Sequence, residues 1–271
     1  MGLRINTNVA SLNTSRVLRR STSDLNRSLE RLSSGLRINR AADDAAGLAI
    51  ADGFQSQVRG TAVAQRNAQD GVSLVQTAEG ALGETTNILQ RVRELAVQSA
   101  NGTQSTNNRA TIDNEVQQLL SQIDDIATDT EFNGIRVLSS AQTVTLQAGP
   151  NPSQTLVVSV NGSKTSDLGV STVNVSSVAS AVSAISTIDI AIQSVSTLRS
   201  NLGALQNRLQ FTINSLAIQE ENATASESAI RDADIAQETI KFTRNQILVS
   251  AGTSVLAQAN VTPQTALQLL R

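Results

Sequence analysis

The residues of this chain that could do acid–base chemistry or bind a cation are the adjacent carboxylates Asp43 and Asp44. Such a pair needs a third ligand, a nucleophile or a base beside it before it can hold a metal or act on a substrate. The chain has no His and no Cys, which removes the usual soft metal ligands and the common general base near neutral pH. No phosphate-cradling Gly-rich loop is present either. We therefore expect no enzyme activity, no catalytic residue, no metal and no cofactor.

The composition argues against a compact globular core. There is no Trp or Tyr, and the aromatic residues are Phe54, Phe132, Phe211 and Phe242, so the large side chains that usually fill cores are scarce. Ala, Leu, Ile, Val, Ser, Thr, Gln and Asn dominate, which suits close packing between helices. The formal net charge of -2 includes no block of like charge. We therefore expect neither a nucleic-acid partner nor a membrane partner.

Both ends of the chain carry apolar residues at the three- and four-residue spacing of a helix, over residues 3–36 and 230–271. The seam residues of the two ends are Leu18, Leu25, Leu29, Leu32, Leu256, Leu267 and Leu270. The first helix should stop near Gly35, after which Asn39 can cap the next helix. Each stripe needs a partner surface, so we expect the ends to pack together. Other copies would bury the apolar surface that remains, which indicates a self-assembling structural protein.

The middle of the chain contains both helical and strand-like patterns. Helical spacing covers residues 58–101, 112–126 and about 177–222. The last of these segments keeps one seven-residue phase through Ile188, Val195, Leu202, Leu209 and Leu216. Alternating β-branched residues at 143–146, 156–160 and 170–175 predict one or two β-hairpins.

The expected fold class is mainly α, a long antiparallel helical coiled-coil or bundle rod with its N- and C-termini paired. A small β-hairpin region near residues 141–177 lies in the middle of the chain. We expect two domains. Residues 1–44 with 231–271 would form a terminal coiled-coil domain, and residues 45–230 a helical rod that carries the hairpins.

The amino terminus gives an expectation about export. Residues 1–14 contain no apolar h-region and no small-residue cleavage site, so they do not form a cleaved secretory signal peptide. Polar residues interrupt the uncharged tract at 245–270, so we expect no transmembrane span there or elsewhere. A protein of this kind that acts outside the cell requires a dedicated export route.

Several short motifs lie near the two ends of the chain. The amino-terminal motifs are INTN at residues 5–8, SLN at 11–13, LSSGLRIN at 32–39 and DDAAGLAI at 43–50. The carboxy-terminal motifs are RDAD at 231–234 with Glu238, GT at 252–253, QAN at 258–260, PQ at 263–264 and LLR at 269–271. In this order they resemble the two terminal signatures of bacterial flagellin. The resemblance covers nearly the whole chain apart from residues around 141–177, and it indicates a short form without large outer domains.

The resemblance implies a structural subunit that polymerises into the extracellular flagellar filament used for swimming. In the family the termini form an inner coiled-coil layer around a central export channel, and larger members insert outer domains near residues 141–177. The implied partners are further copies of the chain, the flagellar export apparatus, a cytosolic export chaperone, the filament cap and the hook-associated junction proteins.

The resemblance also implies a vertebrate partner, the Toll-like innate immune receptor for flagellin. Residues 90–98 resemble the receptor-binding helix of the recognised flagellins. The contact residues implied in this way are Gln90, Arg91, Glu94, Leu95, Gln98 and Glu115. The alternative is ordinary subunit surface that is used in lateral packing, and both uses of the surface are compatible.

Two other protein classes share some of these features. A cytoplasmic signalling coiled coil of the chemoreceptor type is also long, poor in aromatics and rich in Ala, Ser and Gln, but its heptads would run unbroken where this chain is β-like. A hook–filament junction protein is related at the ends. The long carboxy-terminal match favours the filament subunit over the junction protein.

Overall fold

The computed structural model describes residues 7–268, with side chains described as far as residue 262. The helices are α1 (Val9–Ser34), α2 (Ala45–Ala100), α3 (Thr106–Asp129), α4 (Val178–Arg231) and α5 (Ile235–Gln268). The strands are β1 (Glu131–Phe132), β2 (Ile135–Arg136), β3 (Gln142–Gln147) and β4 (Thr155–Val160). The fold is mainly α, as the sequence predicted. It divides into two compact units, Met1–Ser56 with Asn222–Arg271 and Gln57–Glu221.

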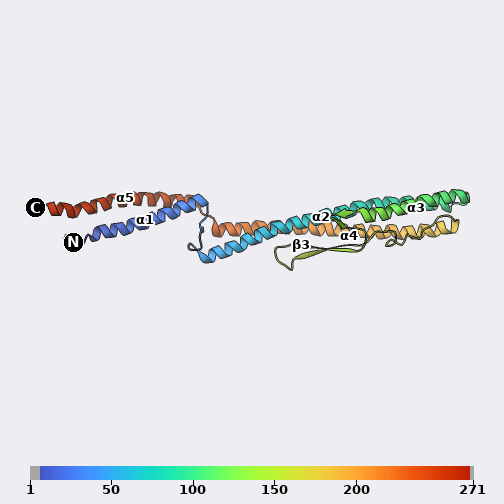
Figure 1. The fold of residues 1–271 in the computed structure, drawn as a ribbon, viewed down its shortest axis with the longest axis horizontal. Coiled ribbons are helices and arrows are strands. Elements are labelled where there is room, and N and C mark those ends of the chain that lie inside the picture. The colour runs from blue at the N-terminus through green and yellow to red at the C-terminus, as the bar shows by residue number, and fades with distance from the viewer. Residues whose placement is uncertain (1–6, 269–271) are drawn as a thin grey trace. The chain divides into compact units, whose positions relative to one another are not determined.

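In the first unit, α1 and α5 lie side by side and run antiparallel (Figure 1). At one end of the pair, Asn8 Nδ2 donates to the carbonyl of Ala259 at 2.8 Å. At the other end, Leu36 and Asp232 form an antiparallel bridge. Gly35 ends α1 in the left-handed conformation, with φ of 74°, which suits a residue without a Cβ. The pairing of the two ends of the chain is therefore confirmed.

The seam between α1 and α5 alternates leucine with serine. Leu18, Leu25 and Leu32 are half-buried, and the heptad positions between them are the buried Ser21 and Ser28. Leu29, which the sequence pattern placed in this seam, is 54% exposed and lies outside it. The reason is geometric, because a residue that follows a seam position points about 100° away from it around the helix.

A buried carboxylate crosses this seam. Glu238 on α5 is 5% exposed, and its Oε2 accepts a hydrogen bond from Lys241 Nζ at 3.1 Å. Arg31 Nη1 of α1 lies 3.9 Å from the same oxygen. Burial by itself would raise the pKa of Glu238, but hydrogen bonds from Ser28 and Lys241, together with the charges of Lys241 and Arg31, lower it. The side chain is therefore ionised at neutral pH.

The second unit has one aliphatic core to which α2, α3 and α4 all contribute. The α4 residues at seven-residue spacing, Ile188, Val195, Leu202 and Leu209, are each 2% exposed or less. The facing residues of α2 and α3 include Leu82, Leu89, Val92, Val116 and Ile123, all fully buried. Buried alanines such as Ala68, Ala78 and Ala96 lie among them, as expected for close helix packing without aromatic side chains.

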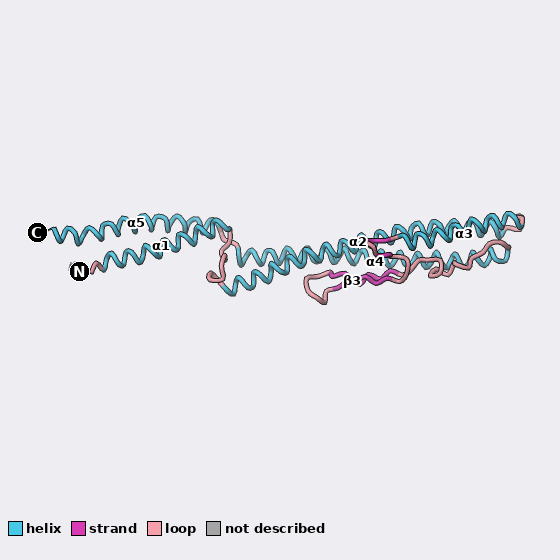
Figure 2. Tube along the Cα trace, in the orientation of Figure 1, coloured by secondary structure: helices cyan, strands magenta, loops and turns pink. Residues whose placement is uncertain are grey.

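The β-hairpin of β3 and β4 lies along the long helices of the second unit (Figure 2) and contacts both α2 and α4. Alternate β4 residues are buried, so one face of the hairpin joins the core. Glycines on α2 make room for it. A Cβ on Gly71 would come within 2.3 Å of Leu146 Cδ1, and one on Gly60 within 2.9 Å of Pro150 Cβ. The hairpin that the sequence predicted from residues 143–146 and 156–160 is confirmed.

Residues 161–177 contain no regular secondary structure, so the strand expected at 170–175 is wrong. Side chains of α3 bind the backbone here in place of a partner strand. The Asp124 carboxylate accepts from the amide and hydroxyl of Thr165, each at 2.8 Å, and Asp113 Oδ1 accepts from the amide of Val175 at 2.7 Å. The amides of Val170 and Val173 donate to carbonyls within the loop. The alternating residues therefore follow an irregular path, because their amides are satisfied without a partner strand.

Among the described helices, α4 has the length and composition to cross a membrane, with a window of mean hydropathy 1.5. One such helix is weak evidence, because buried core helices meet the same criterion. In α4 the residues at seven-residue spacing, among them Val195 and Leu202, are buried in the second unit's own core.

Two isoleucines on α4 provide a matched test of this core. Ile188 is fully buried and Ile190 is 66% exposed. We expect Ile188→Ala to lower the free energy of unfolding by about 2–5 kcal/mol, because it leaves a cavity in a packed core. Ile190→Ala should change it by less than about 0.5 kcal/mol. Urea unfolding followed by circular dichroism measures both, and equal losses would contradict the core assignment.

The Glu238 network should make stability depend on pH. Its pKa is lower in the folded chain than in the unfolded chain, so its contribution is present above the ordinary carboxyl pKa and is lost as the pH falls through the lowered value. We expect Glu238→Gln to reduce the free energy of unfolding by about 1–2 kcal/mol at neutral pH, and much less in strong acid.

Urea unfolding of both proteins across this pH range measures the difference. The control is Glu79→Gln, whose exposed carboxylate faces Arg199 at 3.7 Å and should matter by less than about 0.5 kcal/mol. A loss for Glu238→Gln that is the same at both ends of the pH range would refute the electrostatic role.

Candidate functional site

The adjacent carboxylates Asp43 and Asp44 shape the chain between α1 and α2. Asp43 Oδ2 accepts from the backbone amides of Asn39 and Arg40 at 3.3 and 3.2 Å. Asp44 Oδ1 accepts from the amide of Gly47 at 2.8 Å and so caps α2. The expected cap at Asn39 is therefore wrong, because the helix begins only at Ala45. No group of three metal-ligating side chains occurs within residues 7–262.

The α1–α5 pair exposes many large apolar side chains, and we call this surface the terminal apolar face. Its members on the two helices are Val9, Leu12, Val17, Leu29, Ile235, Ile240, Ile247, Leu248, Val255 and Val261, each 45–63% exposed. Full burial of one such side chain is worth about 1.5–3 kcal/mol, so an uncovered face of this kind favours association.

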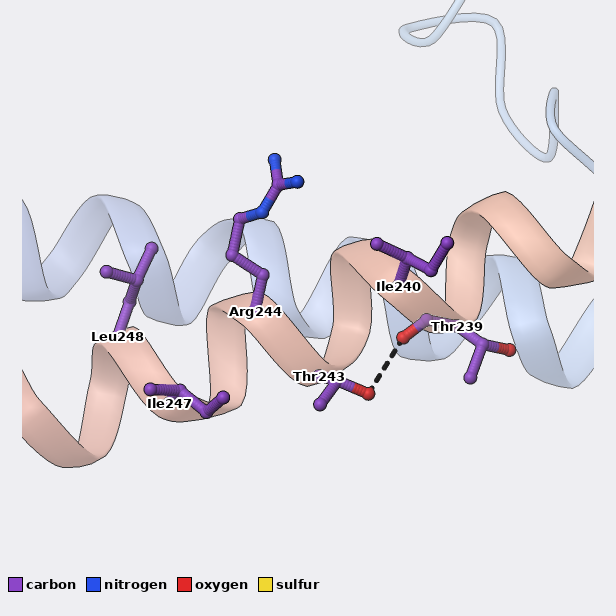
Figure 3. A pocket seen from close by; sticks show the side chains of 6 residues that line it. All are labelled: Thr239, Ile240, Thr243, Arg244, Ile247 and Leu248. Atoms are coloured by element: carbon purple, nitrogen blue, oxygen red, sulfur yellow. Dashed lines mark hydrogen bonds between the residues drawn. The ribbon is translucent and has the colours of Figure 1, made fainter.

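A shallow groove on α5 forms part of this face (Figure 3). Ile240, Ile247 and Leu248 line it together with Thr239, Thr243 and Arg244. The Thr243 hydroxyl donates to the carbonyl of Thr239 at 2.9 Å, so this hydroxyl is satisfied within the helix. Another protein chain that binds in this groove would therefore contact mainly apolar side-chain atoms.

The seam residues expected from the sequence fall into different environments. Leu18, Leu25, Leu32 and Leu256 are half-buried in the first unit, and Leu29 belongs to the terminal apolar face. The structure places Ile188, Val195, Leu202, Leu209 and Leu216 in the subunit's own interior. The side chains of Leu267 and Leu270 lie outside the described residues, as do residues 5–6 and 269–271 of the terminal motifs.

Sequence reasoning did not single out the exposed residues of α5. Ile240 and Ile247 are seven residues apart, as are Leu248 and Val255, so α5 carries a second apolar stripe. That spacing was visible in the sequence. Which stripe faces α1 and which faces outward was not, since α5 is apolar around most of its circumference.

A charged cluster occupies the surface that α2 and α3 share. Arg91 Nη2 lies 3.0 Å from Glu115 Oε1 of α3, and Arg91 Nη1 lies 3.2 Å from Glu94 Oε2 of α2. The hydrogen bonds and charges of Glu115 and Glu94 raise the pKa of Arg91, so the cation is permanent. Gln90 and Gln98 are exposed on the same helix.

Leu95 and Arg93, within the same segment, do not belong to the charged cluster. Leu95 is 2% exposed and is part of the core beneath the cluster, so it is closed to a rigid partner. Arg93 pairs with Asp189 of α4 at 2.6 Å instead of joining Arg91. The accessible residues of the cluster are therefore Gln90, Arg91, Glu94, Gln98 and Glu115.

Comparisons with known proteins agree over the whole length. The model of the bacterial flagellin N-terminal helical region matches residues 5–143, and that of the C-terminal helical region matches residues 185–270. The chain is 44% identical to a flagellin of Bacillus subtilis, over 99% of this chain and 100% of that protein. It is 43% identical to a flagellar filament 33 kDa core protein of Treponema phagedenis, over 98% of this chain and 99% of that protein.

A solved structure shares the fold at low identity. It is that of a putative flagellar hook-associated protein from Vibrio parahaemolyticus, with a TM-score of 0.59 and 12% identity, over 70% of this chain and all of that one. At this identity the likeness concerns the fold alone. On the matches to both terminal helical regions and to full-length relatives, the chain belongs to the bacterial flagellin family.

Proposed function

We propose that the terminal helix pair drives polymerisation of this chain, a structural subunit of the bacterial flagellar filament, around a central export channel. The protein is not an enzyme, and the filament that it forms is extracellular. The observation that carries the proposal is the terminal apolar face of α1 and α5. A pair of helices buries only the stripes that face each other, so the outward stripes need other copies of the chain.

The domain roles follow from this proposal. Residues 1–44 with 231–271 would form the inner coiled-coil layer, and residues 45–230 the shell around it. The compact units support this division, although they place the boundaries about ten residues further along α2 and before the end of α4. The short hairpin region leaves no room for large outer domains.

The remaining partners are proposed from the family. They are the flagellar export apparatus, a cytosolic chaperone that covers the carboxy-terminal helix, the filament cap and the hook-associated junction proteins, with export that uses no cleaved signal peptide. The apolar groove on α5 supports the need for a chaperone, because that surface would be exposed before assembly.

The alternative functions are less well supported. A hook–filament junction protein shares the terminal helices, but the two relatives described above, named as a flagellin and a filament core protein, match this chain from end to end. A signalling coiled coil of the chemoreceptor type would lack the β-hairpin at β3 and β4.

Polymerisation should fail when the outward stripe of α5 becomes polar. We expect Ile240→Ser with Ile247→Ser to raise the critical concentration for filament growth at least tenfold, since each isoleucine contributes about 1.5–3 kcal/mol when buried. The two side chains are 60% and 63% exposed, so the unfolding transition of the monomer should not move. Light scattering with negative-stain electron microscopy measures growth.

The control is Val157→Ser, which changes an exposed valine (49%) on β4. It should polymerise like the unchanged chain, because the family places this region on the outside of the filament. Normal filaments from the double isoleucine variant would refute the role of the terminal apolar face.

We also propose that the Arg91 cluster is a contact surface for the vertebrate Toll-like flagellin receptor. Its exposed cation and paired carboxylates support this reading, as does the resemblance of residues 90–98 to the receptor-binding helix. Leu95 would act indirectly, by supporting the helix from the core. The same surface can also serve in lateral packing, since a receptor that binds monomers can use a face that the filament covers.

Arg91→Ala should weaken receptor signalling at least tenfold, because an arginine at the centre of an interface is often worth more than about 2 kcal/mol. Arg93→Ala is the matched control, since this arginine has similar exposure and pairs with Asp189 on another helix. A reporter-cell assay with purified monomers measures both variants. Equal potency of Arg91→Ala and the unchanged chain would rule out the contact.

A further inference from the structure

The apolar pattern of α1 and α5 does not by itself fix their alignment. Leu18, Leu25 and Leu32 repeat every seven residues, so a slip of one heptad, about 10.5 Å along the axis, puts leucine where leucine was. The half-buried apolar residues of α5 also recur at this spacing, as Phe242, Val249 and Leu256 do. Hydrophobic burial would therefore be similar in both alignments.

The polar contacts of the pair are specific to one alignment. Asn8 reaches Ala259 at one end, and Leu36 bridges Asp232 at the other end. Within the seam, the single buried carboxylate of the described chain meets α1 at Ser28 and Arg31. Such a group is costly to bury unless its partners lie opposite it.

We propose that Glu238 sets the register of the two terminal helices, so that α1 and α5 can pair in one alignment only. Lys241, on the same helix as Glu238, keeps its position in any alignment. Ser28 and Arg31 belong to α1 and are opposite Glu238 only in the observed alignment. Within the seam, the energy difference between registers comes mainly from Arg31, because a slip of one heptad toward the amino terminus puts Ser21 in the place of Ser28. The end contacts of Asn8 and Leu36 add to this difference.

Both neighbouring registers are unfavourable for Glu238. A slip of one heptad in one direction replaces Arg31 with Asp24, which brings two carboxylates together. A slip in the other direction replaces Arg31 with Ile38, which lies beyond the end of α1 at Ser34. In the first slipped register the carboxylates of Glu238 and Asp24 repel each other. In the second, Glu238 has no partner on α1.

This inference concerns the pairing within one chain and does not depend on polymerisation. It assigns Glu238 a positioning role that differs from the role of the terminal apolar face. Failure of the chain to form filaments would count against the proposed function. The register of α1 and α5 could still be measured within the single chain.

Cysteine pairs can report the register, because the natural chain has no cysteine. A Cβ on Gly252 lies 3.8 Å from the Cβ of Leu18, which is the spacing of a disulfide. Leu18→Cys with Gly252→Cys therefore reports the observed alignment. Ser11→Cys and Leu25→Cys, each combined with Gly252→Cys, report slips of one heptad in the two directions.

Each pair is oxidised in the full chain, and the intramolecular disulfide is quantified by non-reducing electrophoresis and peptide mass spectrometry. The pair at 18 and 252 should dominate in the otherwise unchanged chain. Glu238→Leu should lower its yield relative to the slipped pairs about tenfold or more, which corresponds to about 1.4 kcal/mol. Glu30→Gln is the control, since Glu30 pairs with Arg40 outside the seam and should leave the ratio unchanged.

A charge exchange tests the direction of the effect. Asp24→Arg with Arg31→Asp keeps the composition but moves the arginine by one heptad, so the pair at 11 and 252 should become the major product. A general loss of helix stability would lower the disulfide yield of all three cysteine pairs. It would not make the pair at 11 and 252 the major product. Dominance of the pair at 18 and 252 in both the Glu238→Leu and the exchanged chains would overturn the proposal.

Discussion

The limited burial that helices with very few aromatic residues can achieve determines most of this structure. In the second unit, the leucines, isoleucines and alanines of α2, α3 and α4 cover one another and form a closed core. In the first unit, α1 and α5 have only each other, and the seam between them contains buried serines as well as leucines. Two helices of this size leave about half of their apolar side chains uncovered. The proposed role of the termini in assembly rests on this uncovered apolar surface.

A thin seam also changes what polar residues do. In a large core, a carboxylate such as Glu238 would mainly reduce stability, since burial disfavours its charge. Between two slender helices it has a few defined partners, and these partners distinguish one alignment from the next. The polar residues of the first unit supply the specificity that its repeating leucines lack.

Most of the fold could be predicted from the sequence, but the details of the seam between α1 and α5 could not. Helical spacing and the hairpin were readable because they are local patterns, and the α4 leucines keep one phase through the whole core. The strand at 170–175 was wrong because its backbone bonds to Asp113 of α3 and within the loop itself, and these contacts leave no signal in the alternating pattern. The sequence did not show that Leu29 lies outside the α1–α5 seam, 54% exposed, because two adjacent stripes on one helix look equally apolar.

The segment between α1 and α2 has a consequence for the lifetime of the protein outside the cell. Proteases bind extended backbone, and helical backbone is protected by its own hydrogen bonds. Residues 36–44 are not helical, and they present exposed Arg37 and Arg40, the residue type that trypsin-like enzymes cleave after. A cut there would separate α1 from the folded second unit. Neighbouring copies that shield this segment would then decide whether a subunit resists digestion.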